Sequence, residues 1–424
     1  MSNKVKLEDV ASLTVGFVGN MAKEYVDTGV SFFRSLNIKP FYIDDKDLLH
    51  ISSEFNEKIK KSKLREGDIV IVRTGQPGTC CVIPKEYDGC NCSDLVIVRP
   101  NKNKVNPHYL EAYINFMTQK QINNHQVGAI QKHFNVGSAK EMILYLPEIR
   151  TQEKCADIVK VLNKKIENNN RINSELEAMA KTIYDYWFLQ FEFPNEDGKP
   201  YKSSGGKMVW NEELKREIPE EWKVDFLGRL FTSKRGISYN SKSIEGSGVP
   251  MINLASFNVD GSYKEEGIKV YSGEYSEEKV VRPFELLMCN TQQTAIDYKK
   301  DIIGKAFLVP DIFEGDIVTS HHVTTIQVKK DNMKYFLHRL FNTDYFHKYA
   351  AGFTNGTNIL GLIFSGIENY RLEIPDDAVL EKFADLILDI EMKKSKIIKE
   401  NQELISLRDF LLPLLMNGQV GFKA

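Results

Sequence analysis

The sequence has no run of about 18 consecutive apolar residues, no excess of charge of one sign and few cysteines. Lys plus Arg number 56 and Asp plus Glu 58, so the formal net charge of −2 gives the 424-residue chain no overall field toward an anionic membrane or a nucleic acid. Its first residues, MSNKVKLEDVASL, carry acidic side chains where a secretory signal would be apolar. We therefore expect a cytoplasmic protein without a membrane span.

Six cysteines in a chain of this length, in which we see no secretory signal, are most simply reduced thiols. Cys80 and Cys81 precede Cys90 and Cys92, but zinc sites usually use cysteine pairs separated by two to four residues and need four converging ligands. We expect these cysteines to be small apolar side chains in or near strands, and we expect no metal site.

Motifs for common enzyme chemistry are also missing. The sequence contains no G-x-x-x-x-G-K-[ST] phosphate loop, no G-x-G-x-x-G dinucleotide turn and no Asn/Asp-Pro-Pro-Tyr/Phe loop of the kind that holds a flipped base. Asp376 and Glu391 fit a nuclease pattern superficially, but on one helix they would lie about 22 Å apart, too far to share a metal. His133, His321 and His322 have no nucleophile or carboxylate cluster beside them in the sequence. We therefore expect no catalytic residue and no cofactor bound by this chain.

An internal repeat is the strongest feature that is present. EKCADIV at residues 153–159 recurs as EKFADLI at residues 381–387, an offset of 228 residues that holds without a gap from 147–187 to 375–415. Upstream, the copies match with small insertions: residues 64–74 with 281–291, 78–84 with 304–310, and 29–38 with 248–257. The two halves of the chain therefore contain the same segments in the same order.

Each copy begins with about 150 residues of short β-rich runs bounded by Gly, Pro and Asn turns, and ends in a long helical segment. In the helical segments, seam positions alternate in steps of three and four, which is typical of a coiled coil. These positions are Cys155, Ile158, Leu162, Lys165, Asn169, Ile172, Leu176, Met179, Ile183 and Tyr186 in the first copy, and Phe383, Leu386, Ile390, Lys393, Ile397, Glu400, Leu404, Leu407, Leu411 and Leu414 in the second.

We predict that the two helices pack antiparallel about a pseudo-twofold axis. Lys165, Asn169, Lys393 and Glu400 interrupt the apolar seam, either as register-fixing or solvated positions or as contacts to a partner. A helix of about 40 residues is about 60 Å long, so the pair would hold two globular units apart like a ruler. Units separated on that scale could meet duplex DNA in grooves about one helical turn apart.

The expected fold class is α+β, with two globular domains of mixed structure separated by the two antiparallel coiled-coil helices. The Gly, Pro, Ser and charged residues of PNEDGKPYKSSGGKMVWNEELKRE mark a surface connector between the halves. The predicted segments are a first domain at 1–147, a central helical region at 148–192, the connector at 193–217, a second domain at 218–374 and a C-terminal helical region at 375–424.

Three motifs resemble a known family. Trp187-Phe188 leads into FEFPNEDGKPYKSSGGKMVWNEELKREIPEEW at residues 191–222, followed by Leu227-Gly228, and the chain closes with LRDFLLPLLMNGQV at residues 407–420. Together they resemble the specificity (S) subunit of type I restriction-modification systems. The resemblance covers essentially the whole chain, although in the two target-recognition domains it is mainly one of layout.

The resemblance implies a non-catalytic subunit that reads a bipartite, asymmetric sequence in double-stranded DNA, one half-site per recognition domain. It also implies that the helices set the unread spacer and dock two methyltransferase (M) subunits, with two restriction (R) subunits as further partners. S-adenosylmethionine, ATP and Mg²⁺ would then be bound by the partner subunits. The alternative from a different class is a coiled-coil structural adaptor that assembles other proteins without reading DNA.

Candidate DNA-binding residues are polar side chains on Gly-rich loops, because Arg, Lys, Asn and Gln can address base edges in the major groove. The segment at residues 128–135 also resembles a QKH-N pattern of the family's recognition domains. The candidates are Arg73, Thr74, Gln76, Thr79, Gln131, Lys132, His133 and Asn135 in the first copy, and Asn290, Thr291, Gln292, Gln293, Lys305, Asn355, Thr357 and Asn358 in the second. The alternative is that these residues form solvated turns.

Aromatic and apolar residues near the helix ends are the candidates for partner docking. They are Tyr184, Trp187, Phe188, Phe410, Leu414 and Leu415. Their alternative role is simple core or helix-to-helix packing within the chain.

Overall fold

The computed structural model describes residues 3–117, 134–293, 301–357, 359–417 and 419. The chain divides into two compact units, which we call unit 1 (residues 1–168 and 401–424) and unit 2 (residues 169–400). Each unit contains part of both long helices, α6 (Ile149–Tyr184) and α10 (Asp377–Met416). The helical regions therefore belong to the cores of the two units and do not form separate compact bodies.

Unit 1 is built around an antiparallel sheet with the strand order β2-β11-β8-β9. Its strands are β2 (Ala11–Val15), β11 (Leu95–Pro100), β8 (Ile69–Val72) and β9 (Cys80–Val82). All four side chains of β8 are buried, because both faces of the sheet are covered. Ile69 and Ile71 face a core that includes α6 and α10, whereas Val70 and Val72 face a second core on the opposite side.

The second core of unit 1 lies under a smaller sheet with the order β10-β4-β7-β3, in which β10 and β4 are parallel. Its strands are β10 (Asn91–Cys92), β4 (Val30–Phe33), β7 (Leu49–Ile51) and β3 (Tyr25–Val26). Two strand pairs complete the unit, β1 (Asn3–Lys6) with β12 (Ile143–Leu146) and β5 (Ile38–Lys39) with β6 (Tyr42–Ile43). The helices are α1 (Leu7–Val10), α2 (Ser53–Lys58), α3 (Pro107–Met117) and α5 (Val136–Lys140).

Unit 2 repeats most of this topology. Its larger sheet has the order β16-β24-β20-β22, and in the smaller sheet, β18-β17-β23-β19, the strands β18, β17 and β23 correspond to β7, β4 and β10, with β17 and β23 parallel. The fourth strand differs, because β19 pairs with β23 whereas β3 pairs with β7. The strands are β16 (Phe231–Arg235), β24 (Val323–Val328), β20 (Leu286–Cys289), β22 (Ala306–Leu308), β18 (Lys269–Tyr271), β17 (Val249–Ile252), β23 (Ile317–Thr319) and β19 (Val280–Val281). This confirms the internal repeat, including the upstream matches.

Other elements of unit 2 extend the repeat. β15 (Lys223–Phe226) pairs with β27 (Arg371–Ile374) as β1 pairs with β12, and unit 2 also contains a three-stranded sheet of β21 (Thr291–Gln293), β26 (Ile359–Leu362) and β25 (Thr354–Asn355). The helices are α7 (Met333–Phe341), α8 (Asp344–Ala351) and α9 (Phe364–Glu368). Much of the connector is a hairpin of β13 (Met208–Asn211) and β14 (Arg216–Pro219).

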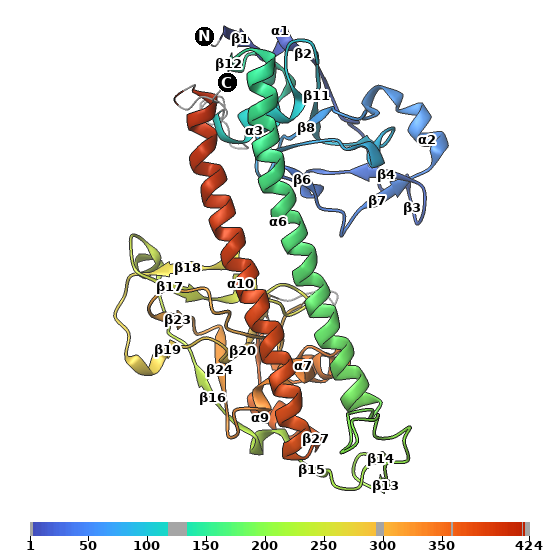
Figure 1. Cartoon of the computed structure of the whole chain (residues 1–424), viewed down its shortest axis with the longest axis vertical. Helices are drawn as coiled ribbons and strands as arrows, with labels where there is room; N and C mark the ends of the chain where they lie inside the picture. The colour runs from blue at the N-terminus through green and yellow to red at the C-terminus, as the bar shows by residue number, and fades with distance from the viewer. Residues whose placement is uncertain (1–2, 118–133, 294–300, 358, 418, 420–424) are drawn as a thin grey trace. The chain divides into compact units, whose positions relative to one another are not determined.

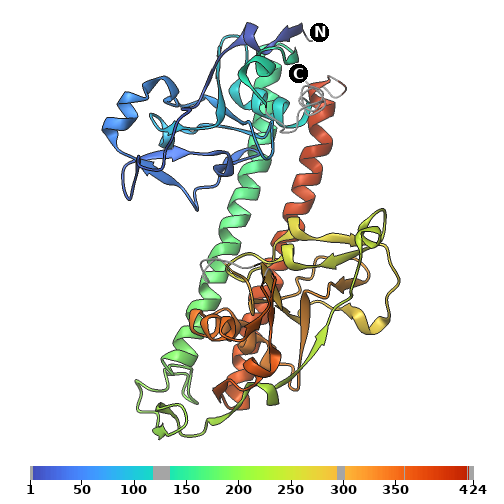
Figure 2. The ribbon, with the colours of Figure 1, turned by 180° about the vertical axis from the view of Figure 1, so that it is seen from behind.

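The two long helices run antiparallel within each unit, as predicted (Figure 2). In unit 1, Asn163 of α6 accepts a hydrogen bond from Arg408 of α10 at 3.0 Å. In unit 2, Asn169 lies beside Glu400, and further along α6 Glu177 lies beside Lys394. The residue numbers of the partners on α10 therefore decrease as those on α6 increase, which is the pattern of antiparallel helices.

The register of the predicted seam needs correction. Ile172 and Met179 were expected inside, but they are 38% and 52% exposed, and the adjacent Asn173 and Ala180 face inward instead. On α10, Leu386 and Leu407 are likewise exposed, at 43% and 46%. A straight helix has 3.6 residues per turn, so a strict 3.5-residue stripe drifts by about 20° per heptad. The inward face therefore follows the straight-helix period, and several apolar seam residues are left on the surface.

A buried charge network joins α7 to both long helices in unit 2. The Arg339 side chain is 4% exposed, donates to Glu391 at 2.8 Å and forms an ion pair with Glu177. Lys394 bonds Glu177 at 2.7 Å. Burial alone would raise the pKa of Glu177, but the charges of Arg339 and Lys394 outweigh burial and hold that pKa below its ordinary value.

Candidate functional site

Two loops in unit 1 meet at the end of β8, where Arg73 and Thr74 follow the strand. Arg73 forms an ion pair with Asp94 at 3.3 Å and donates from Nε to the Phe134 carbonyl, also at 3.3 Å. The Thr74 hydroxyl donates to the second Asp94 oxygen at 2.7 Å. Because the Phe134 amide in turn donates to the Arg73 carbonyl, the segment before α5 is fixed against this loop.

The remaining candidates of the first copy lie in different environments. Gln76 is exposed at the tip of the loop, between Gly75 and Gly78, which both have positive φ. Asn135 is also exposed and caps α5 by accepting from the Ser138 amide at 2.9 Å. Thr79 is only 9% exposed, so little of its side chain is open to a ligand, and its role as a DNA contact stays a prediction. The predicted contacts Gln131, Lys132 and His133 lie outside the described residues.

The corresponding site in unit 2 has the same backbone arrangement and different side chains. Asn290 and Thr291 follow β20, and the Leu362 amide donates to the Asn290 carbonyl as Phe134 does to Arg73. The Thr291 hydroxyl lies 2.7 Å from His322 Nδ1. A histidine therefore stands in unit 2 where unit 1 has Asp94.

Asn290 is fully buried, and its role as a DNA contact stays a prediction. Its amide nitrogen donates to the His321 carbonyl at 3.1 Å and to the Thr324 hydroxyl at 2.7 Å. Lys305 is 6% exposed and donates to the Asn342 carbonyl at 3.3 Å, and burial lowers its pKa. The Asn290 side chain thus ties the end of β20 to the residues around the start of β24, whereas Lys305 bonds the end of α7.

The three-stranded sheet of unit 2 brings other candidates together. Gln292 lies on β21, and the exposed Asn355 lies on β25, on the opposite side of β26. Gln292 also accepts from the Ile302 amide at 3.4 Å. Thr357 is exposed in the turn between β25 and β26. For Gln293 only the backbone, within β21, is described, and Asn358 lies outside the described residues.

Basic and aromatic side chains surround His322. The rings of His321 and His322 are 3.9 Å apart, and Tyr239 lies 5.8 Å from His321. Lys269 donates to the Tyr239 hydroxyl at 3.3 Å. Burial lowers the pKa of His322, and the neighbouring His321, Lys269 and Arg235 lower it further. Unit 2 therefore presents an uncharged imidazole at neutral pH within a basic setting.

Sequence reasoning missed Asp94 and did not place His322 in the site. The internal repeat contains the information that identifies these two residues as counterparts. An offset of 228 residues aligns Asp94 with His322, and each directly precedes one of the matching strands β11 and β24. A side-by-side alignment of the two copies would have selected this position.

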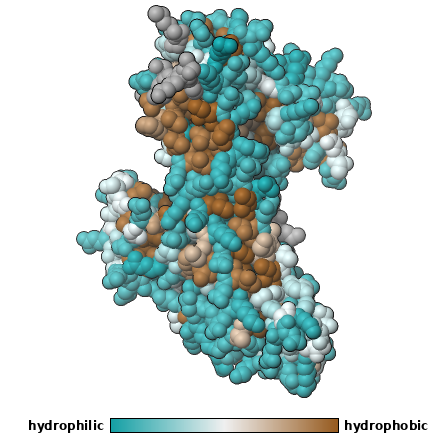
Figure 3. Space-filling view, in the orientation of Figure 1, coloured by the Kyte–Doolittle hydropathy of each residue, from teal (hydrophilic) through white to brown (hydrophobic). Residues whose placement is uncertain are grey.

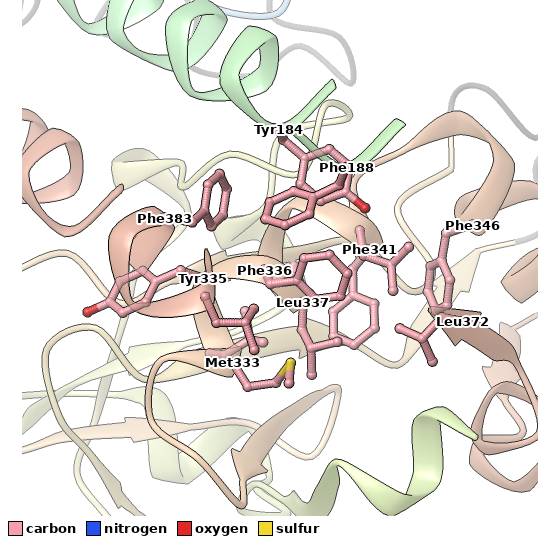
Figure 4. Close-up of a cluster of buried hydrophobic side chains, with 14 of the residues drawn as sticks. Tyr184, Phe188, Met333, Tyr335, Phe336, Leu337, Phe341, Phe346, Leu372 and Phe383 are labelled. Carbon is pink, nitrogen blue, oxygen red and sulfur yellow. The ribbon is translucent and has the colours of Figure 1, made fainter. Parts of the chain in front are cut away.

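Four of the six docking candidates are buried, and their role in docking stays a prediction. Tyr184, Trp187 and Phe188 are at most 8% exposed and pack with Phe383 and other rings in the unit 2 core (Figure 4). Leu415 is 5% exposed in the core of unit 1. This burial agrees with the alternative role given for these residues, which is packing in the core or between helices of the chain.

The other two docking candidates differ. Phe410 is 66% exposed, and Leu414 is partly buried. Figure 3 shows an apolar area over the C-terminal turns of α10, where Ile405, Leu407 and Phe410 are all exposed. Docking of a partner at this area stays a prediction.

All six cysteines are buried free thiols. In the described part of the chain, no group of three or more His, Cys, Asp or Glu side chains is placed to hold a metal ion. None of the helices within the described ranges is both long enough and apolar enough to cross a membrane.

Comparison with known proteins gives consistent matches. Residues 2–178 and 219–406 match the family model described as the type I restriction modification DNA specificity domain. The specificity subunit of the type I restriction enzyme MjaIX of Methanocaldococcus jannaschii is 25% identical over 284 residues, 66% of this chain and 61% of that protein. This chain thus covers less than two thirds of that relative's length.

The HindI specificity subunit of Haemophilus influenzae is 23% identical over 407 residues, which cover 85% of this chain and 88% of that protein. The crystal structure of the type I restriction-modification system S subunit from M. genitalium aligns with a TM-score of 0.55. That alignment covers 98% of this chain and 96% of the other at 12% identity, so the likeness is one of fold.

Proposed function

The chain belongs to the type I restriction modification DNA specificity family, and on this premise we propose that it is the non-catalytic subunit that selects the DNA sequence for a type I restriction-modification complex. In this proposal, the recognition domain of unit 1 reads one half of a bipartite, asymmetric site and the recognition domain of unit 2 reads the other half. The chain contributes sequence readout, and partner subunits contribute the chemistry.

One observation carries the proposal. The larger sheets of the two units share strand order and register, yet the loops after β8 and β20 present different side chains at matching positions, Arg73 and Asp94 against Asn290 and His322. A repeated scaffold with different loop chemistry suits two half-sites of unlike sequence, because sequence is read through side chains that reach base edges.

Partners follow from the same proposal. Two methyltransferase subunits would dock on the helices, and the exposed apolar area of Ile405, Leu407 and Phe410 is the surface we assign to this contact in unit 1. S-adenosylmethionine, ATP and Mg²⁺ would be bound by the methyltransferase and restriction subunits. The near-zero net charge of the chain fits this division of labour, because a partner can supply many of the phosphate contacts. The complex would act on DNA in the cytoplasm.

The helices α6 and α10 would set the unread spacer between the half-sites. Inserting whole turns into both helices at matched positions should lengthen the spacer and leave both half-sites unchanged. Altered half-sites with a constant spacer would contradict the ruler role.

The function is tested by mapping methyladenine across a genome in cells that make the methyltransferase subunit with and without this chain. We expect methylation at a two-part motif only when the chain is present. Purified chain alone should neither methylate nor cleave DNA. If methylation occurs without the chain, or shows no sequence preference with it, the proposal is wrong and the structural adaptor remains.

A further inference from the structure

The loops after β8 and β20 each place a threonine against the residue that precedes the neighbouring strand. Val72 pairs with Leu95 in unit 1, and Cys289 pairs with Val323 in unit 2. Thr74 and Thr291 each follow two residues after the first member of these pairs. Asp94 and His322 directly precede the second members.

The same hydrogen bond closes both sites. The Thr74 hydroxyl lies 2.7 Å from Asp94, and the Thr291 hydroxyl lies 2.7 Å from His322. Because the adjacent strand pairs share one register, the carboxylate and the imidazole take matching places in the chain, although Asp94 has a positive φ of 52° and His322 does not.

The two partners of the threonines offer opposite chemistry to a ligand. Asp94 is an acceptor with a 45% exposed side chain, and it fixes the guanidinium of Arg73. His322 is partly exposed and has Nδ1 engaged by Thr291; when that hydroxyl donates, the neutral ring carries its proton on Nε2. Unit 1 thus presents an oriented Arg–Asp pair, and unit 2 presents a single N–H donor.

We infer that Asp94 and His322 are the specificity-determining residues at one matched base position in each half-site. The ligand is a base edge in the major groove, where all four base pairs differ in their donors and acceptors. The Arg73–Asp94 pair suits a guanine next to an amino-bearing base, and the His322 donor suits a purine N7 or guanine O6. This inference rests on the proposed function and adds the residues that tell the half-sites apart.

The test uses the full chain assembled with its methyltransferase subunit and maps methyladenine sites for D94N and H322N. D94N should lower the preference for the native base at one position of the first half-site by about tenfold to a hundredfold, and H322N should do so in the second. Each variant should leave the other half-site and the spacer unchanged.

Two further variants remove the threonine hydroxyls, a third serves as a control, and thermal melting tests the folding of all of them. T74V and T291V nearly preserve side-chain shape while removing the hydroxyl, so they should disturb the same positions as D94N and H322N respectively. H108N, on α3, exchanges another histidine and should leave both half-sites intact. Unchanged thermal melting would show that each variant is folded.

The outcomes separate the two claims. If the wild-type complex reads a two-part motif and D94N and H322N read it with identical preference, the inference fails and the proposed function stands. A uniform loss of methylation with an unchanged motif would indicate phosphate contacts and would also overturn the inference. If the wild-type complex shows no sequence preference, the proposed function itself fails.

Discussion

The Asn169 amide donates a hydrogen bond to the Glu400 carboxylate at 2.8 Å, and this bond joins α6 to α10. Both residues interrupt the apolar stripes of their helices, 231 residues apart in the chain. Asn169 is 1% exposed. A shift of either helix by one residue would leave a buried amide without this partner, so the pair favours one register over its neighbours.

Replacing Asn169 by Ala should lower the free energy of unfolding by about 1–3 kcal/mol, because the Glu400 carboxylate loses its buried donor. A double-mutant cycle with E400A, measured by chemical denaturation, should show that the two losses are not additive. K393A serves as the control because Lys393 also interrupts the stripe but is exposed. Additive losses for N169A and E400A would show that the pair does not fix the register.

Replacing Arg339 by Ala should destabilise unit 2 by about 3–5 kcal/mol, since it leaves Glu391 buried without its guanidinium partner. Denaturant unfolding followed by tryptophan fluorescence measures this loss. R171A removes the exposed ion pair with Glu175 and should change stability little. Equal effects of R339A and R171A would contradict a structural role for the buried network.

Replacing Phe410 by Ala should weaken binding of the methyltransferase subunit by about tenfold or more and leave the melting temperature unchanged, because the ring is 66% exposed. Replacing the buried Phe188 by Ala should instead lower stability by about 3–5 kcal/mol. Titration calorimetry and thermal melting separate the two effects. W210A is the matched control, an aromatic residue 57% exposed on the β13–β14 hairpin, and it should bind normally. Normal binding by F410A would remove this residue from the docking surface.

Stability should fall on mild acidification. His338 is 3% exposed; burial, followed by the charge of Arg339, lowers its pKa well below the ordinary 6.5. Below about pH 6.5 the unfolded chain binds a proton at this position that the folded chain does not. The free energy of unfolding should therefore decrease by up to about 1.4 kcal/mol per pH unit from this group. In denaturation series between pH 8 and pH 5, H338N should show a smaller slope, and an unchanged slope would contradict the assignment.

The repeat made much of the fold predictable. Matched segments such as 64–74 and 281–291 became matched strands, because a common hydrophobic pattern specifies common strand pairing. The antiparallel helices also followed from the repeat. The inward face of the helices did not, since Ile172 and Met179 fit a 3.5-residue stripe while the helix keeps its own period.

The site was less predictable because local sequence does not reveal burial. Asn290 and Lys305 have the residue types that read bases, yet tertiary packing encloses both. The aromatic residues at the two ends of the connector show the same limit: Phe193 at its start stacks on Trp222 just beyond its end at 5.2 Å in the core of unit 2, where the sequence indicated a surface segment. Asp94 was missed because its hydrogen bond joins it to Thr74, 20 residues away in the chain.

The central sheet of each unit has a further consequence. Alternate residues of β8 and β20 point to two separate cores, one shared with the long helices and one on the far side. A mutation that repacks the far core is thus insulated by a layer of strands from the anchorage on the helices. The side chains of the far core can therefore change in sequence while the core that packs on α6 and α10 keeps its shape. The surface next to the far core can thus be altered without refolding the whole domain.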